Sequence, residues 1–177
     1  MEAKEGVSEP VVLCKTASSP CSGTYPKGTA IEAASTSSWL LKAGFANITC
    51  AESSLKGEVT NPGPTGPVSG IISSLGFSNC GSSTVDVLKN GTFSIGSPSS
   101  GNGTFKLEGY EVTVSALPTS CVYGGTASFS LTGGATASLK STGSLSKTSG
   151  GFACANPASL EAAYKVSAPA PLFVEKS

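Results

Sequence analysis

Residues 105–114 have the sequence Phe105-Lys106-Leu107-Glu108-Gly109-Tyr110-Glu111-Val112-Thr113-Val114, in which apolar and polar side chains alternate. Alternation with a period of two is typical of a β-strand that has one face on a core. The apolar residues occupy odd positions up to Leu107 and even positions from Tyr110. A strand keeps its apolar side chains on one face across such a shift only if it contains an extra residue. We therefore predict a β-bulge at Gly109.

The same alternation recurs on both sides of this segment, and clusters of Gly and Pro separate the repeats. Apolar side chains take one parity at 55–59 and at 127–131, and residues 69–77 share one parity at Ser69, Ile71, Ser73, Leu75 and Phe77. Residues 157–164 also alternate, so we predict a strand there. The pattern gives about twelve strands and an all-β fold, expected to be an antiparallel two-sheet sandwich with a closed β-barrel as the alternative.

The length of 177 residues is within the range of one domain. The polar opening of the chain, residues 1–10, is expected to be a disordered N-terminal tail. Residues 11–177 are expected to form a single β domain stabilised by disulfides.

The cysteine content is even, and no two cysteines form the close C-x2-4-C pairs of structural zinc sites. Fifteen disulfide pairings are formally open to six cysteines. The spacing favours the sequential pairing, Cys14 with Cys21, Cys50 with Cys80, and Cys121 with Cys154.

Three disulfides indicate an oxidising compartment, so we expect a secreted or cell-surface protein. The chain carries no signal peptide, and we expect that one has been removed. No apolar run approaches the ~20 residues of a transmembrane helix.

The composition excludes several kinds of chemistry. The chain has no His and no Arg, and its 11 Lys balance 11 acidic residues. Without His, the nucleophilic pairs and metal sites that use imidazole cannot form. Without Arg or a positive excess, nucleic acid is not an expected partner. We expect no cofactor and no metal site.

Several motifs resemble those of a family of small secreted proteins that soil actinobacteria encode in many copies. These motifs are Cys14-(x6)-Cys21 with Pro20, Tyr25-Pro26-Lys27-Gly28-Thr29, Gly70-Ile71-Ile72-Ser73-Ser74-Leu75-Gly76-Phe77-Ser78-Asn79-Cys80, Ser120-Cys121-Val122-Tyr123-Gly124, Gly150-Gly151-Phe152-Ala153-Cys154 and Pro171-Leu172-Phe173-Val174. The resemblance implies export and a β-rich fold. The family has no assigned activity, so no catalytic residue follows from it.

Two arrangements could support catalysis without His. Glu108 and Glu111 are a close pair of carboxylates of the kind that glycoside hydrolysis requires, but solvated strand carboxylates are the expected interpretation. Lys56 and Lys147 each lie near Ser residues, as in a Ser/Lys dyad, yet both fall on polar parities, whereas an activated Lys must be buried. We therefore expect no enzymatic activity.

The function expected from the sequence is a non-catalytic one, in binding, structure or assembly. Ligand contacts are expected from four aromatic residues, Tyr25, Trp39, Tyr110 and Tyr123, although Trp39 lies beside Leu40 and Leu41 and is expected to be buried. The expected partners are a cell-wall polymer, a surface protein or further copies of the chain. The alternative is a membrane-inserting β-barrel or pore-forming protein, indicated by alternating small apolar and hydroxyl residues at 126–149.

Overall fold

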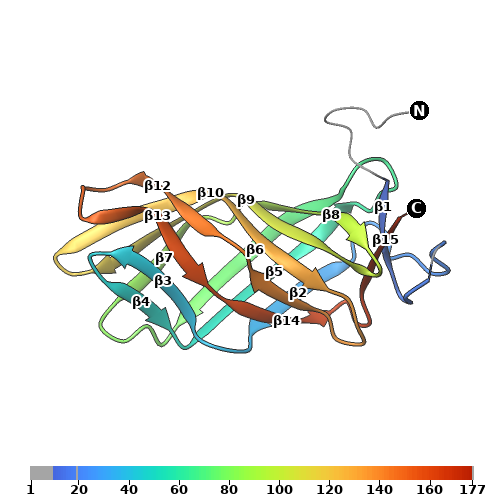
Figure 1. The fold of residues 1–177 in the computed structure, drawn as a ribbon, viewed down its shortest axis with the longest axis horizontal. Helices are drawn as coiled ribbons and strands as arrows, with labels where there is room; N and C mark the ends of the chain where they lie inside the picture. The colour runs from blue at the N-terminus through green and yellow to red at the C-terminus, as the bar shows by residue number, and fades with distance from the viewer. Residues whose placement is uncertain (1–9, 19, 177) are drawn as a thin grey trace.

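The computed structural model describes residues 10–18 and 20–176, and their regular structure consists of fifteen β-strands with no helix (Figure 1). The predicted disordered tail lies, apart from residue 10, outside the described residues. The all-β prediction is confirmed. The segments predicted as strands at 105–114, 127–131 and 157–164 lie in β9, β10, and β13 with β14, respectively.

Eight of the strands form a closed ring, each paired antiparallel with the next. In order round the ring they are β9 (Asn102–Ala116), β10 (Thr119–Thr132), β11 (Ser138–Ser141), β14 (Ala163–Ala168), β2 (Ala30–Ser35), β5 (Glu52–Asn61), β6 (Val68–Ser78) and β8 (Thr92–Ser99). The closed barrel, which was the alternative expectation, is thus the arrangement of these strands. The barrel closes because β9 and β10 form a long hairpin that joins the two ends of the sheet. The hairpin extends from the pair Ala116 and Thr119 to the pair Gly103 and Leu131.

The strands outside the ring extend one end of the barrel. Beside β10 and in order of pairing they are β12 (Ser144–Ser149), β13 (Cys154–Glu161), β3 (Trp39–Gly44) and β4 (Asn47–Cys50), and β7 (Thr84–Lys89) pairs with β9. In Figure 1 this extension occupies the end of the molecule away from the two termini. The edge strand β4 is tied to the segment before β7 by the disulfide Cys50–Cys80.

The remaining pair, β1 (Val11–Cys14) with β15 (Phe173–Lys176), lies at the opposite end of the barrel (Figure 1). The backbone of Val174 donates to Gly101 O at 2.9 Å, and that of Leu172 donates to Gly134 O at 3.0 Å. Because Val11, Leu13, Leu172 and Val174 are buried, this pair adds apolar surface to the core.

The β-bulge predicted at Gly109 is confirmed. Along β9 and β10, Tyr110 pairs with Gly125 and Glu108 pairs with Thr126, so Gly109 is the extra residue. Its φ of 70° is in the left-handed region that glycine adopts without strain. Phe105 and Leu107 before the bulge and Tyr110 and Val112 after it are all buried in the core.

The uniform parity expected for residues 69–77 is wrong, because β6 contains a bulge of its own. Ser74 pairs with Lys56, but Ile72 pairs with Gly57, which leaves Ser73 as the extra residue. Consequently Ile72 is buried, Ile71 is 47% exposed, and Leu75 and Phe77 pack against the core. The Asn90 side-chain amide donates to the Ser73 carbonyl at 3.1 Å, which satisfies a backbone group that the bulge removes from the ladder.

The three disulfides pair as the spacing predicted, Cys14–Cys21, Cys50–Cys80 and Cys121–Cys154. Cys121–Cys154 joins β10 to β13 across the intervening strand β12. Each bridge stabilises a fold by roughly 2–4 kcal/mol, chiefly by restricting the unfolded chain.

Candidate functional site: an apolar cavity at the end of the barrel

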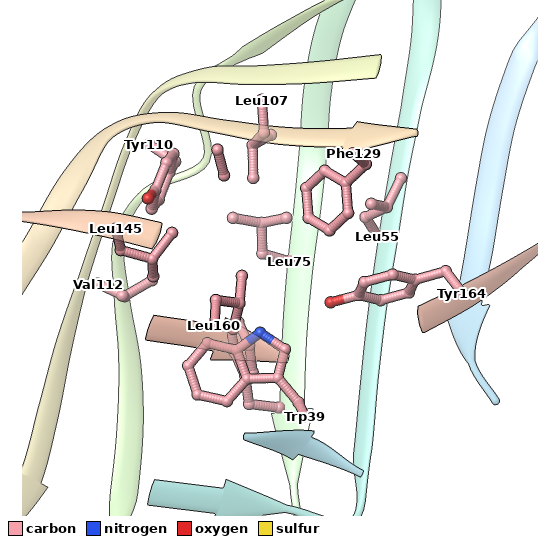
Figure 2. Close-up of a pocket in the computed structure, with 12 residues that line it drawn as sticks. Trp39, Leu55, Leu75, Leu107, Tyr110, Val112, Phe129, Leu145, Leu160 and Tyr164 are labelled. Carbon is pink, nitrogen blue, oxygen red and sulfur yellow. The ribbon is translucent and has the colours of Figure 1, made fainter. Parts of the chain in front are cut away.

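A cavity lies inside the molecule where the barrel meets the strands that extend it (Figure 2). Its free volume is about 30 Å³, more than the ~10–15 Å³ that one water molecule requires. When the adjoining space that is open to solvent is included, the volume is about 420 Å³. Side chains from eight strands line it: Trp39, Leu55, Leu75, Phe77, Leu107, Tyr110, Val112, Ala127, Phe129, Leu145, Leu160 and Tyr164.

The two β-bulges place part of this wall. Leu75 and Phe77 follow the bulge at Ser73, and Tyr110 and Val112 follow the bulge at Gly109. Side chains alternate between the two faces of a strand, so a strand without its bulge would direct these residues outward. The local irregularities of β6 and β9 therefore help to build the cavity.

Aromatic rings form two sides of the cavity. Trp39 on β3 contacts Phe77 on β6 edge to face, with ring centroids 4.8 Å apart. Phe129 and Tyr164 meet in the same manner at 5.9 Å, and Phe129 continues into the barrel through Phe105 at 6.2 Å. Further along, Phe105 stacks on Phe93 at 5.5 Å and fills the barrel interior. This cavity thus lies at the end of the barrel where Trp39 lies.

Only two of the lining side chains have a hydroxyl group, and their surroundings differ. The hydroxyl of Tyr164 points into the ring of lining side chains in Figure 2 and lies 2.7 Å from Oγ of Ser53, which is itself buried. The hydroxyl of Tyr110 is buried and has no hydrogen-bond partner within residues 10–18 and 20–176. An unpartnered buried polar group is destabilising by about 1–3 kcal/mol, so this position calls for an explanation.

Burial keeps both phenols protonated. It raises the pKa of Tyr164 to about 12, against a smaller lowering by the hydrogen bond with Ser53. Burial also raises the pKa of Tyr110 well above its ordinary value. Both groups are therefore neutral hydroxyl donors at physiological pH.

The structure brings together two of the four aromatic residues expected to contact a ligand. Trp39 and Tyr110 both line the cavity and both are buried, as was expected for Trp39. Tyr123 is also buried away from the surface, and its hydroxyl donates to Ala155 O at 2.8 Å. Half-buried Tyr25 donates to Pro171 O, with Nζ of Lys15 at 5.5 Å from its ring centroid.

Tyr164, Phe77 and Leu160 are cavity residues that sequence reasoning missed. The alternation at 157–164 indicated that Leu160 and Tyr164 share a face, and this signal could have added them to the candidates. The parity expected at 69–77 likewise placed Phe77 on one face with Leu75, and this signal could also have added it to the candidates.

The other candidate groups lie outside the cavity. The bulge at Gly109 places Glu108 and Glu111 on the outer face of β9, opposite the buried Leu107 and Tyr110. Lys56 is exposed, and Nζ of Lys147 donates to Gly151 O at 3.1 Å. No cluster of three or more metal-ligating side chains occurs in the part of the chain that the structure describes.

Comparison with known proteins gives no relative for this chain: no family model, no curated protein and no solved structure matches it. Over the described ranges, no helix is long and apolar enough to cross a membrane.

Proposed function

We propose that the protein is a secreted or cell-surface, non-catalytic β-barrel that binds a small apolar molecule in the cavity at the end of its barrel. The observation that carries the proposal is the wall of this cavity, where apolar side chains and five aromatic residues surround free space. Ligand sites are typically concave and apolar with few polar groups, and barrel mouths are a frequent place for them. Eight-stranded barrels can enclose one small ligand.

The three disulfides support an extracellular location, since such bridges persist in oxidising compartments. The outer face of the barrel carries Lys, Glu, Ser and Thr, as at Lys56, Glu58 and Thr60 of β5. This surface is compatible with an aqueous environment, and it leaves the interior as the apolar binding surface of the barrel.

Trp39 allows the proposal to be tested without a label, because it is the only Trp of the chain and lines the cavity. We expect methylenecyclohexane, a small neutral hydrocarbon, to change the emission of Trp39 in a saturable way and to raise the Tm. The matched control is Ala127→Leu, which adds side-chain volume to the wall and should weaken binding at least about tenfold. Absence of saturable binding to the native protein, or unchanged binding to Ala127→Leu, would contradict the proposal.

A second function, insertion into membranes, has one observation in its favour. Leu117 and Phe152 are 87% and 101% exposed, on two loops at the same end of the molecule. The disulfide Cys121–Cys154 joins β10 and β13, the strands that follow these two loops.

The faces of the barrel argue against a membrane-spanning role, because lipid-facing strands carry apolar residues outward and polar residues inward. Here the interior is apolar and the outer face of β5 is polar. We expect no dye release from phosphatidylcholine and phosphatidylglycerol vesicles. Release that is lost on Phe152→Ser would favour the membrane function over the proposed one.

A further inference from the structure

We propose that the ligand of the cavity is a neutral apolar molecule with a hydrogen-bond acceptor of the carbonyl or ether type, which the hydroxyl of Tyr110 receives. The inference rests on the proposed function and specifies the chemical class of the ligand. Three observations carry it: the unpartnered hydroxyl of Tyr110, the lack of charge on the cavity wall, and the position of Tyr110 within that wall.

Of the hydroxyl groups at the cavity, that of Tyr110 is the one without a hydrogen-bond partner in the described ranges. Ser53, Tyr110 and Tyr164 each have one O–H proton, and the only hydrogen bond between them joins Ser53 to Tyr164. Whichever of these two donates, the proton of the other is not used in that bond. The proton of Tyr110 also has no acceptor among the residues that the structure describes. A phenol donates a hydrogen bond more readily than it accepts one, because its oxygen shares a lone pair with the ring, so an acceptor is the partner that best satisfies Tyr110.

The wall carries no charged side chain, since its twelve lining residues are apolar apart from the two tyrosine hydroxyls and the indole N–H of Trp39. An ionised ligand would lose its hydration without gaining a partner of opposite charge, and this penalty is large. A water molecule is a poor occupant as well, because buried water needs about two to four polar partners. A neutral molecule with an apolar body and one acceptor satisfies both the wall and the unpartnered donor.

Tyr110 occupies a place from which it can serve such a ligand. Its neighbours Leu107 and Val112 on β9 line the same cavity, so an apolar body that contacts them lies beside its ring. The hydroxyl oxygen itself is buried among side chains. A ligand acceptor would therefore reach it through small rotamer adjustments of the kind that accompany many binding events.

The test uses two molecules of nearly equal shape, cyclohexanone and methylenecyclohexane, which differ by a carbonyl oxygen in place of a CH₂ group. Binding of both to the native protein and to Tyr110→Phe is followed by Trp39 emission and by the change in Tm. For each probe, the Kd for Tyr110→Phe is divided by the Kd for the native protein. Dividing the ketone's value by the hydrocarbon's value then cancels the difference in hydration of the two probes. We expect this ratio to be about five to ten, the effect of one neutral hydrogen bond.

Tyr164→Phe is the matched control. This variant removes a hydroxyl group from the same wall, but one that already has a hydrogen-bond partner, Ser53. We expect a ratio near one for it. The far-ultraviolet circular dichroism of both variants should match that of the native protein, since each loses a single oxygen atom.

Each other outcome has a defined meaning. If both probes bind the native protein and the Tyr110→Phe ratio is near one, the acceptor inference is overturned while the proposed function stands. If neither probe binds, the proposed function and the inference fail together. If the ratio is high for Tyr164→Phe instead, the assignment of the donor to Tyr110 is overturned.

Discussion

The hydroxyl groups of Ser53 and Tyr164 lie 2.7 Å apart in the core, although 111 residues separate them in the sequence. This hydrogen bond joins β5 to β14, two strands of the ring that are not neighbours, because β2 lies between them. It satisfies the side chain of Ser53, which is 4% exposed. Tyr110, on the same cavity wall, has no such partner in the described ranges.

This contrast predicts opposite effects of two similar substitutions. Tyr164→Phe would leave the hydroxyl of Ser53 buried without its partner and should lower the free energy of unfolding by about 1–3 kcal/mol. Tyr110→Phe would remove an unpartnered hydroxyl and should leave the stability unchanged or raise it by about 1 kcal/mol. Urea unfolding of the two variants beside the native protein measures both effects. A larger loss of stability for Tyr110→Phe would show that its hydroxyl is satisfied in the native state.

The raised pKa values of the tyrosines predict a loss of stability in alkali. A phenol whose pKa is higher in the folded state than the ordinary value of about 10 remains protonated after its unfolded counterpart has ionised. Its contribution to stability is complete below pH ~10, and it is lost as the pH rises through the folded pKa, about 12 for Tyr164. The free energy of unfolding should fall by up to ~1.4 kcal/mol per pH unit for each such group.

The measurement is the Tm of the native protein, Tyr110→Phe and Tyr164→Phe between pH 9 and pH 11.5. Each variant should lose less stability than the native protein over this range, because it lacks one of the two buried phenols. Curves that run parallel to the native one would show that these phenols titrate normally.

The bulge at Gly109 predicts the effect of changing this residue. Its φ of 70° disfavours any residue with a Cβ, while an added Cβ would contact nothing within 4 Å. Gly109→Ala should therefore destabilise the fold through backbone strain alone, by about 1–2 kcal/mol. Gly109→Asn should have a smaller effect, because Asn adopts this conformation more readily. Equal stability of the native protein and Gly109→Ala in urea unfolding would contradict a left-handed conformation at the bulge.

The disulfide Cys121–Cys154 closes a segment with a sequence separation of 33 and should stabilise the fold by roughly 3–4 kcal/mol. The double variant Cys121→Ala and Cys154→Ala should consequently have a lower Tm in oxidising buffer. Adding a reductant should then reduce the Tm of the variant less than that of the native protein. Equal effects of the reductant on both proteins would indicate that this bridge does not contribute.

The sequence indicated the fold best where apolar residues alone mark the inner face of a strand. In β9 the parity shift at Gly109 was visible because Leu107 and Tyr110, on either side of it, are both large and apolar. The disulfides followed from spacing, since each pairs two cysteines that are consecutive in the sequence. Strand type and bridge pairing were thus accessible without coordinates.

The second bulge was hidden for a definite physical reason. Gly70 occupies an inward position of β6, where an added Cβ would lie 2.5 Å from the ring of Phe93. Glycine contributes no apolar signal to the pattern, and Ile71 beside it faces outward, so the segment appeared to keep one parity through Leu75 and Phe77. The inner face of β6 was therefore misassigned before the bulge, at Ile71, but not after it, at Leu75 and Phe77.

Neither the closure of the barrel nor the cavity could be predicted from the alternation of apolar and polar residues. Alternation identifies strands but not their neighbours, and the ring depends on long-range pairing between β2, β5 and β14. Of the cavity wall, Trp39 and Tyr110 were singled out as possible ligand contacts, and Trp39 was expected to be buried, but nothing indicated that they share a cavity. Their shared cavity becomes visible only when β3 is placed opposite β9.

The most direct test of the central claim, that an accessible apolar cavity exists inside the barrel, is a crystal structure of the native protein under xenon pressure. Xenon binds in dry apolar cavities. We expect a single internal xenon site enclosed by Trp39, Phe129 and Leu160. An interior without xenon at this position, with these side chains packed together, would contradict the account.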